Sequence, residues 1–487
     1  MRQLEIIPGV LAWLTLILVI VFSWQLPAIV AVFIILFDIY WLLRTIYLII
    51  HLRDGYRRMK QNLKTDWIGK LEGTNWRDIY HLIILPMYQE PHALVKETLE
   101  SLKNNKYPKD RFLVVIAAEE KAGAASNEIA DRLAGEYKDE FYKIFATHHP
   151  AGLTGEIPGK GSNSAWAGNE AKKVVDQLKI PYENVLVSVF DVDTQVFPDY
   201  FGCLAWNFFN CENPQRSSFQ PIPLFTNNIY QAPAPARVVA YSATFWQLIV
   251  QTRPDRLVTF SSHSMPFKAL VEIGFWQKNV VSEDSRIFWQ CYLHYNGDWR
   301  VTPLLYPISM DANVAPSFWK TMVNTYKQQR RWAYGAENIP FIMREFSKNR
   351  LIPLRKKFFW VFQQIEGMHS WATNAFIIFA LGWLPLLLGG QAFNYTVLAY
   401  NLPNVTRLIM AVASIGIATS AVLALALLPK KPDWFRPFHY VWYLVQWLLT
   451  PLVMVLLGSL PALEAHTRLM LGGKFKLGFW VTPKSRT

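Results

Sequence analysis

Residues 185–194 read VLVSVFDVDT, a short apolar run that ends in two carboxylates. The run has the length of one buried parallel strand and is too short for a helix. Side chains alternate along an extended chain, so Asp191 and Asp193 are expected to face one spot. In an open α/β sheet, ligands bind beyond the carboxyl ends of the strands. Two oxygen ligands there favour a Mg²⁺ or Mn²⁺ ion that also holds phosphate oxygens, and a solvated turn with two acids is the structural alternative.

The composition indicates a membrane protein of several domains. The chain has 487 residues, of which 52% are hydrophobic, 15% aromatic and 17% charged, and its net charge is +13. The length predicts two or three domains, and the composition is too apolar for an ordinary soluble protein. No basic run carries a nucleic-acid motif, so we expect no nucleic-acid partner. Cys203, Cys211 and Cys291 lack C-x-x-C spacing, which argues against a disulfide framework or a zinc site and fits a reducing compartment.

Apolar stretches predict membrane helices at both ends of the chain. A transmembrane hairpin is expected over 1–50, followed by a basic linker over 51–77, which the positive-inside rule places in the cytoplasm. Amphipathic interface helices are expected over 313–353, and further spans over 354–461. Five spans would place the basic tail, 462–487, outside the cell, whereas its Lys and Arg residues argue for the cytoplasm. Either the last apolar segment is a re-entrant hairpin or the stretch 358–370 belongs to a span.

Between these segments, residues 78–312 have the pattern of an α/β domain. A strand followed by a loop is expected over 81–91, a second strand over 111–120, and helices over 92–105, 126–143 and 162–178. Strand and helix in alternation are typical of a parallel sheet. The Pro-rich stretch 220–236 is expected to be a loop or an edge, because Pro cannot donate to the ladder of a central strand.

Four further motifs surround the two aspartates in chain order. They are PMYQE at 86–90, GKGSN at 159–163, SED at 282–284 and QQRRW at 328–332. A glycine turn with a lysine at a helix N-terminus can meet a phosphate. Each motif alone also fits a structural role, as a turn, a loop lysine, a helix-capping acid or a basic helix face.

Taken together and in this order, D-x-D, E-D and Q-x-x-R-W resemble the membrane-embedded family 2 glycosyltransferases, the cellulose, chitin and hyaluronan synthase group. The resemblance covers roughly residues 82–335 and the membrane layout on both sides. It implies a GT-A-like α/β nucleotide-sugar domain with a mostly parallel sheet, inserted between transmembrane helices. The tail sequence FWVTPK at 479–484 is similar to the F-x-V-T-x-K gating loop of bacterial cellulose synthases, which covers the nucleotide.

The resemblance implies a role for each motif. Asp191 and Asp193 would hold Mg²⁺ or Mn²⁺ and the nucleotide diphosphate, and Asp284 would be the general base. The remaining substrate- and nucleotide-binding residues would be Tyr88, Glu90, Glu119, Lys160, Glu283, Gln328, Arg331, Trp332, Thr482 and Lys484.

Two departures leave parts of this assignment open. The family usually has an aspartate after the second strand, where this chain has Glu119 and Glu120. The acceptor-site stretch is FSSHSM at 260–265, where the family usually has a Cys-Gly pair. The contact to the base or ribose and the identity of the sugar are therefore not settled by the motifs.

The resulting hypothesis is an inverting transfer of a sugar from a nucleotide-diphosphate sugar, with UDP as the expected carrier, to a growing polysaccharide, coupled to export. One alternative is non-processive transfer of one sugar to a lipid acceptor. Another is a transporter with a degenerate nucleotide-binding domain. The expected partners are the nucleotide sugar, a glycan or lipid-linked acceptor and membrane lipid, while partner subunits are undetermined. The expected location is the inner or plasma membrane, with the catalytic domain in the cytoplasm.

Overall fold

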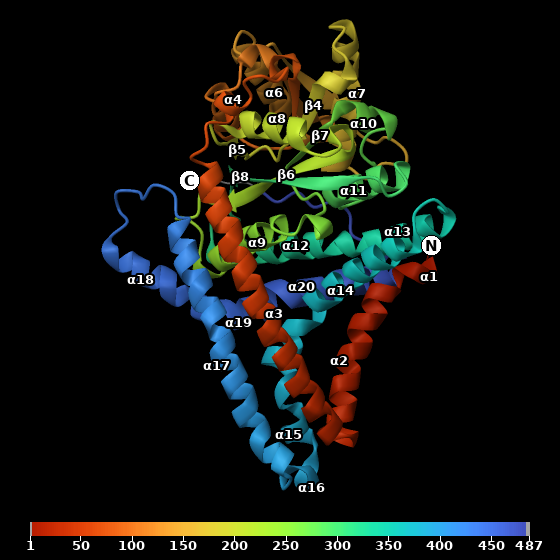
Figure 1. Ribbon diagram of the computed structural model, residues 1–487, viewed down its shortest axis with the longest axis vertical. Coiled ribbons are helices and arrows are strands. Elements are labelled where there is room, and N and C mark those ends of the chain that lie inside the picture. The colour runs from red at the N-terminus through yellow and green to blue at the C-terminus, as the bar shows by residue number, and fades with distance from the viewer. Residues whose placement is uncertain (1, 484–487) are drawn as a thin grey trace.

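The computed structural model describes residues 2–483. Figure 1 shows an α/β domain at the top, a layer of helices lying crosswise beneath it, and long helices that run down and away from the domain. The strands are β1 Tyr80–Pro86, β2 Phe112–Glu119, β3 Lys143–His149, β4 Val185–Val189, β5 Gln195–Val196, β6 Ser217–Phe225, β7 His263–Pro266 and β8 Arg300–Met310.

The helices alternate with these strands and then continue beyond them. From the N-terminus to the end of the α/β domain they are α1 Arg2–Glu5, α2 Ile7–Gln25, α3 Pro27–Asn62, α4 Trp67–Lys70, α5 His92–Lys103, α6 Ala124–Glu136, α7 Lys160–Gln177, α8 Tyr200–Asn210, α9 Ala234–Gln251, α10 Phe267–Glu272 and α11 Glu283–His294. The remainder are α12 Phe318–Ala333, α13 Asn338–Lys348, α14 Leu354–Phe379, α15 Leu384–Leu388, α16 Gly390–Asn394, α17 Val397–Ala426, α18 Pro437–Val445, α19 Thr450–Val453 and α20 Leu460–Leu471.

The eight-stranded sheet has the order β3-β2-β1-β4-β7-β6-β8-β5. Neighbours from β3 to β4 are parallel, β7 is antiparallel to β4 and β6, and β6 is parallel to β8. This arrangement confirms the predicted fold class, a GT-A-like α/β domain with a mostly parallel sheet inserted between long apolar helices.

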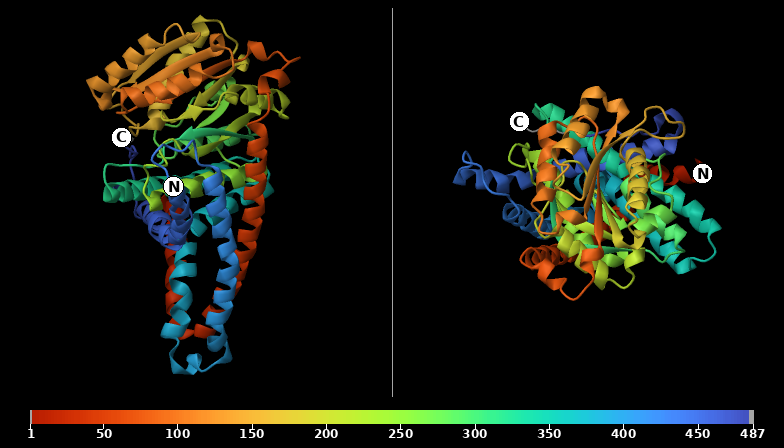
Figure 2. Two further views of the ribbon diagram at one scale, coloured as in Figure 1. Left: turned by 90° about the vertical axis from the view of Figure 1, so that its left-hand side faces the viewer. Right: turned by 90° about the horizontal axis from the view of Figure 1, so that it is seen from above.

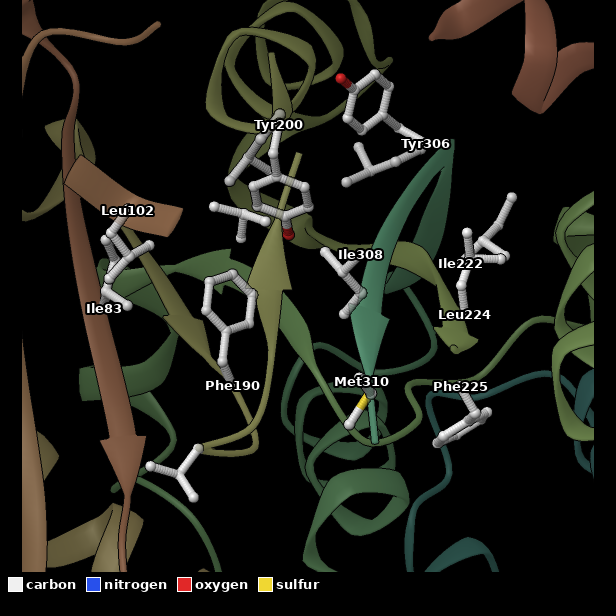
Figure 3. Close-up of a cluster of buried hydrophobic side chains, with 14 of the residues drawn as sticks. Ile83, Leu102, Phe190, Tyr200, Ile222, Leu224, Phe225, Tyr306, Ile308 and Met310 are labelled. Atoms are coloured by element: carbon white, nitrogen blue, oxygen red, sulfur yellow. The ribbon is translucent and has the colours of Figure 1, made fainter. Parts of the chain in front are cut away.

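Apolar side chains fill both faces of the sheet, as continuous apolar strands require. Ile83 and Leu85 of β1 belong to one buried cluster with residues of α5, α6 and α8, whereas Leu82 and Ile84 belong to a second cluster with residues of α7, α10 and α11. Figure 3 shows part of the first cluster, which extends along β8 to Met310. The core therefore continues to the carboxyl ends of the strands.

The strand β3 was not expected from the sequence. The helix predicted over 126–143 ends at Glu136, and an edge strand begins at Lys143. This strand pairs only with β2, so several of its side chains remain partly exposed. Its polar composition, KIFATHH, therefore lacks the apolar run by which the other parallel strands are recognised.

The expectation of a loop or edge over 220–236 is wrong for its first part, because β6 lies inside the sheet between β7 and β8. Pro221 coincides with a break in the β6–β8 register between Gln220 and Ile222. On the other side, β6 pairs with β7 only at Phe219. The Gln220 carboxamide replaces the lost ladder bonds, accepting from Phe260 N at 2.9 Å and donating to Phe260 O at 3.0 Å.

Four helices are long and apolar enough to cross a membrane: Arg2–Gln25, Pro27–Asn62, Val397–Ala426 and Pro437–Leu471. A fifth candidate is the pair Leu354–Phe379 and Leu381–Leu388, which is bent by 50°. The basic stretch after residue 50 continues α3 as far as Asn62. There α3 crosses α9 so closely that a Cβ at Gly55 would lie 2.3 Å from Leu248 O.

The candidate segment Pro437–Leu471 lies crosswise to the other long helices. Figures 1 and 2 show α18, α19 and α20 running across α2, α3, α14 and α17, where α20 packs against α2 and α12. Pro451, Pro461 and a π-helical turn over Met454–Ser459 interrupt the segment. The N-terminal helix α1, the α/β domain and the tail as far as residue 483 therefore lie at the same end of the long helices.

Candidate functional site

A cleft at the carboxyl ends of β1, β2 and β4 gathers the predicted site residues. It measures about 840 Å³ when the solvent in its open mouth is included. Each predicted site residue among 2–483 lines it: Tyr88, Glu90, Glu119, Lys160, Asp191, Asp193, Glu283, Asp284, Gln328, Arg331, Trp332 and Thr482. Lys484 lies outside the described residues.

Asp191 and Asp193 lie in the turn that follows β4, so strand alternation is not what brings them together. The strand ends at Val189, and Thr194 N donates to Asp191 O at 2.8 Å to close the turn. Asp191 is partly exposed in the cleft, whereas Asp193 is fully buried and accepts a 2.9 Å hydrogen bond from Asp311 N. The two carboxylates therefore differ in accessibility.

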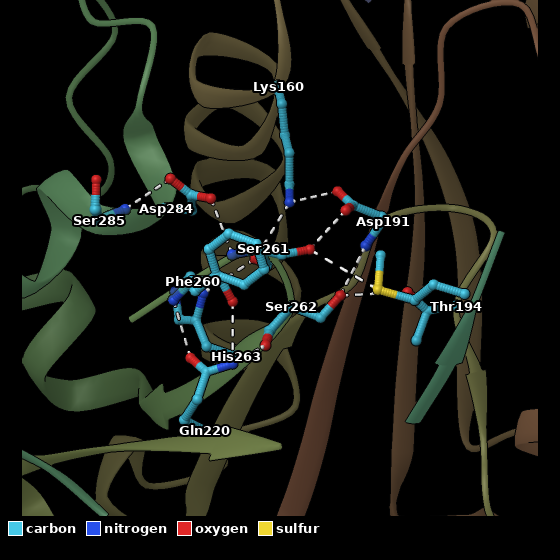
Figure 4. Close-up of polar contacts among 11 residues, drawn as sticks. Lys160, Asp191, Thr194, Gln220, Phe260, Ser261, Ser262, His263, Asp284 and Ser285 are labelled. Atoms are coloured by element: carbon cyan, nitrogen blue, oxygen red, sulfur yellow. Dashed lines mark hydrogen bonds and ion pairs between the residues drawn. The ribbon is translucent and has the colours of Figure 1, made fainter. Parts of the chain in front are cut away.

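Lys160 lies beside these acids at the first residue of α7. Its Nζ donates to Asp191 Oδ1 at 2.6 Å and to Ser261 O at 3.3 Å (Figure 4). Burial lowers the pKa of Lys160, but Asp191, Glu283 and Asp284 together raise it above its usual value. The ammonium group therefore stays charged and balances part of the acidic cleft.

Ser261 joins the two halves of the site and was not among the predicted site residues. Its Oγ donates to Asp191 Oδ2 at 2.7 Å, and its N donates to Asp284 Oδ2 at 2.9 Å (Figure 4). The backbone of Ser261 has φ +49°, in the left-handed region that non-glycine residues seldom adopt. Such strain persists only where surrounding contacts enforce it. The sequence offers no signal for this conformation beyond a short run of serines.

Glu283 and Asp284 begin α11 and have different environments. Asp284 is held by Ser261 N and by Ser285 N, which donates to Oδ1 at 2.8 Å. Burial, and to a lesser extent the charge on Asp284, raises the pKa of Glu283 to about 8. At neutral pH, Glu283 therefore keeps its proton. Neighbouring acids with different environments are typical of sites that assign one of them to proton transfer.

The side of the cleft nearest the crosswise helices carries Gln328, Arg331 and Trp332 on α12. The Trp332 ring packs against Phe260, with ring centres 5.6 Å apart, and against Phe225 at 6.1 Å. Trp332 is partly exposed in the cleft. It therefore offers a flat apolar surface of the kind that sugars contact.

The C-terminal tail closes another side of the cleft. The Phe479 ring lies under the Arg331 guanidinium, 4.9 Å from the ring centre. It also covers Gly159, which has φ +147°, so that a Cβ there would lie 2.5 Å from the ring. Thr482 is buried, and its hydroxyl has no hydrogen-bond partner among residues 2–483. The hydroxyl therefore has a lone pair and a proton to offer to a ligand in the cleft.

The opposite end of the cleft is formed by Tyr88, Glu90 and Glu119. Glu90 Oε2 accepts from Tyr88 N at 2.7 Å, which fixes the turn after β1. Burial and the nearby Glu90 raise the pKa of Glu119 to about 7, and Lys121 opposes this shift. Glu119 can therefore present either a proton donor or an acceptor to a ligand near neutral pH.

A metal ion fits this site only together with a ligand. Within residues 2–483, no three His, Cys, Asp or Glu side chains are placed to hold a metal ion by themselves. Asp191 and Asp193 supply the hard oxygen donors that Mg²⁺ and Mn²⁺ prefer. Mg²⁺ is commonly bound by one or two carboxylates and completed by phosphate oxygens and water.

Glu337, the last residue of the turn between α12 and α13, fixes the start of α11 and was also missed by the sequence. Its Oε1 accepts from Val281 N at 2.9 Å, from Ser282 N at 3.0 Å and from Ser282 Oγ at 2.8 Å. The next residue, Asn338, accepts from Arg286 Nε at 2.6 Å. These contacts join the segment that follows α12, the helix that carries Arg331, to the turn that leads into Glu283 and Asp284.

No protein-family model matches the sequence, and no curated protein has a significantly similar sequence. Among solved structures, a mannosyltransferase from Pyrobaculum calidifontis in complex with GDP-mannose and Mn²⁺ has a TM-score of 0.39 and 15% identity, covering 86% of this chain and 99% of its own. Residues 1–349 of S. aureus TarS in complex with UDP-GlcNAc have a TM-score of 0.37 and 14% identity, covering 73% and 94%. At such identities, residue roles in this chain are argued from its own site.

Replacing Glu337 tests the link between α12 and α11. Glu337→Ala leaves three donors without their shared acceptor and should lower the free energy of unfolding by about 2–4 kcal/mol. Glu337→Gln keeps an oxygen at the same position and should cost much less. Thermal unfolding of both variants in detergent measures the difference, and equal losses would show that the hydrogen bonds at Oε1 are not what stabilises this junction.

The raised pKa of Glu283 predicts a pH-dependent stability. The carboxyl holds its proton more tightly in the folded state, about pKa 8 against 4.5 ordinarily, so its favourable contribution is present below pH 4.5 and is lost as the pH rises through 8. Glu283→Gln cannot ionise and should gain stability relative to the wild type between pH 5.5 and 8.5. Exposed Glu128→Gln is the control, and parallel stability profiles for wild type and Glu283→Gln would contradict the shift.

Proposed function

We propose that this protein is an inverting glycosyltransferase that moves a sugar from a nucleotide-diphosphate sugar to a growing polysaccharide in the cell membrane. The observation that carries the proposal is the meeting of Asp191, Asp193, Asp284, Arg331 and Trp332 in one cleft. These residues come from distant parts of the chain, and each has a function in that reaction. A transporter with a degenerate nucleotide-binding domain has no need of the full set.

Asp284 is the proposed general base. An inverting transfer needs one carboxylate to take the proton from the acceptor hydroxyl. The backbone N–H groups of Ser261 and Ser285 hold the Asp284 carboxylate in place. The neighbouring Glu283 remains protonated near neutral pH, so it does not compete for this role.

Lys160 and Arg331 are the proposed cations for the departing diphosphate. Positioned charges are worth most in a site from which water is excluded. Mg²⁺ or Mn²⁺, bound through Asp191 and Asp193 together with phosphate oxygens, would supply further neutralising charge. Tyr88, Glu90 and Glu119 are the proposed contacts of the nucleoside, and Trp332 and Gln328 those of the acceptor sugar.

The acceptor remains a choice between two classes. Trp332 beside the crosswise helices supports an acceptor that extends from the cleft toward the membrane, which suits both a polymer and a lipid-linked sugar. We favour the polymer, because a tail that closes over the nucleotide protects repeated transfers from water. The basic segments flanking the long helices support placing the catalytic domain in the cytoplasm.

The test is turnover of nucleotide sugars by the purified full-length protein. One member of a panel of UDP- and GDP-sugars should be consumed with release of the diphosphate, and Asp284→Asn should lower turnover by about 10²–10⁴. Binding of UDP or GDP by that variant should stay near normal. Product length on a gel separates a polymer from a single transfer, and failure to consume any donor would favour the transporter.

The metal ion should be required for turnover and should bind together with the nucleotide diphosphate. Chelation with EDTA should abolish turnover, and either Mg²⁺ or Mn²⁺ should restore it. Titration calorimetry should show Mn²⁺ binding only when the nucleotide diphosphate is present, because the carboxylates alone are too few. Asp193→Asn should weaken the binding of both the metal ion and the nucleotide. Full activity in EDTA would exclude the metal assignment.

Closure by the tail is tested with two glycines of one loop. Gly159→Ala places a Cβ against Phe479, whereas Gly155→Ala, also at positive φ, meets nothing within 4 Å. Gly159→Ala should lower turnover by about tenfold, ~1.4 kcal/mol, and should expose the tail to protease even with saturating nucleotide. Gly155→Ala is the control, because it adds backbone strain without a contact to Phe479. If the two substitutions have equal effects, the tail does not close the cleft and serves only as a surface anchor.

A further inference from the structure

Arg237 is a partly buried cation without a countercharge. It lies on α9, where this helix meets α18 and the turn that begins at Gln446. Its Nε donates to Gln446 Oε1 at 2.7 Å, its Nη1 donates to Ala232 O, and its guanidinium lies 4.2 Å from the Tyr443 ring centre. Within residues 2–483, no Asp or Glu side chain forms an ion pair with it. A desolvated charge without a partner is costly, so a compensating anion is expected.

The side chains around Arg237 are also donors without acceptors. Tyr241, Tyr443 and Gln446 are 1%, 4% and 5% exposed. The two phenol hydroxyls and the Gln446 Nε2 have no hydrogen-bond partner among residues 2–483. Buried polar groups are nearly always paired, and these can all donate. Together with the guanidinium they form a cluster of donors that can turn toward one oxygen-rich acceptor.

The surroundings indicate where such an acceptor comes from. The outer face of α18 exposes Phe438, Val441 and Trp442, which suits contact with lipid. The loop before α18 exposes Lys430 and Lys431, cations of the kind that attract anionic headgroups. This loop reaches the cluster, because the Tyr230 hydroxyl donates to Pro429 O at 2.8 Å and the Tyr230 ring lies 6.2 Å from that of Tyr443.

We propose that Arg237, Tyr241, Tyr443 and Gln446 bind the phosphate of an anionic membrane phospholipid. The phosphate supplies the countercharge of Arg237 and accepts from the unpaired hydroxyl and amide groups. None of these four residues lines the catalytic cleft. The bound lipid joins α9 of the α/β domain to the crosswise helices and seats both at the membrane surface.

The experiment measures binding of dioctanoyl-phosphatidylglycerol to the purified full chain in a phosphate-free detergent, by native mass spectrometry. Arg237→Gln should weaken binding by roughly 10- to 100-fold, because it removes a charged donor. Arg355→Ala is the matched control, since Arg355 is an exposed arginine in the first turn of α14 and should leave binding unchanged.

Tyr443→Phe provides a second variant that keeps the packing and removes a single hydroxyl. It should weaken binding by roughly 3- to 10-fold. Dioctanoylglycerol, which lacks the phosphate, should not compete. Equal binding by wild type, Arg237→Gln and Tyr443→Phe would overturn the site, and inorganic phosphate binding as tightly as the phospholipid would overturn the assignment to lipid.

Discussion

The bridge from Asp191 through Ser261 to Asp284 is the interaction on which the site depends. One residue donates from its side chain to the first carboxylate and from its backbone to the second, so their separation is fixed. The antiparallel strand β7 enters the sheet between β4 and β6 and delivers Ser261 to this position. The left-handed backbone at Ser261 is the local cost of turning both donors toward the acids.

Charge balance explains how so many acids share one cleft. Lys160 pairs with Asp191, and burial keeps a proton on Glu283. Arg331 is engaged by the ring of Phe479 instead of a carboxylate and remains suited to an anionic ligand. The cleft thus places its acids and its cations in different environments.

The helices that lie crosswise beneath the α/β domain support the cleft from below in the view of Figure 1. Glu464 of α20 accepts from Tyr326 Oη at 2.7 Å and from Arg330 Nη1 at 2.6 Å, which holds α12, the helix that carries Arg331, against α20. Glu337 then joins the end of α12 to the start of α11. The membrane layer and the α/β domain therefore position opposite sides of the same site, and a lipid bound at Arg237 would add a further link between them.

The sequence alone determined the long apolar helices, the parallel strands β1, β2 and β4, and the residues that gather where those strands end. These follow from local patterns, because apolar runs define spans and strands, and parallel strands bring their carboxyl ends to one edge. Only the tertiary structure decided that β6 is internal despite Pro221 and that the last apolar segment lies crosswise. The contacts of Ser261 and Glu337 join residues far apart in the chain, and burial sets the pKa of Glu283. Such long-range contacts and desolvation leave no trace in the local order of residues.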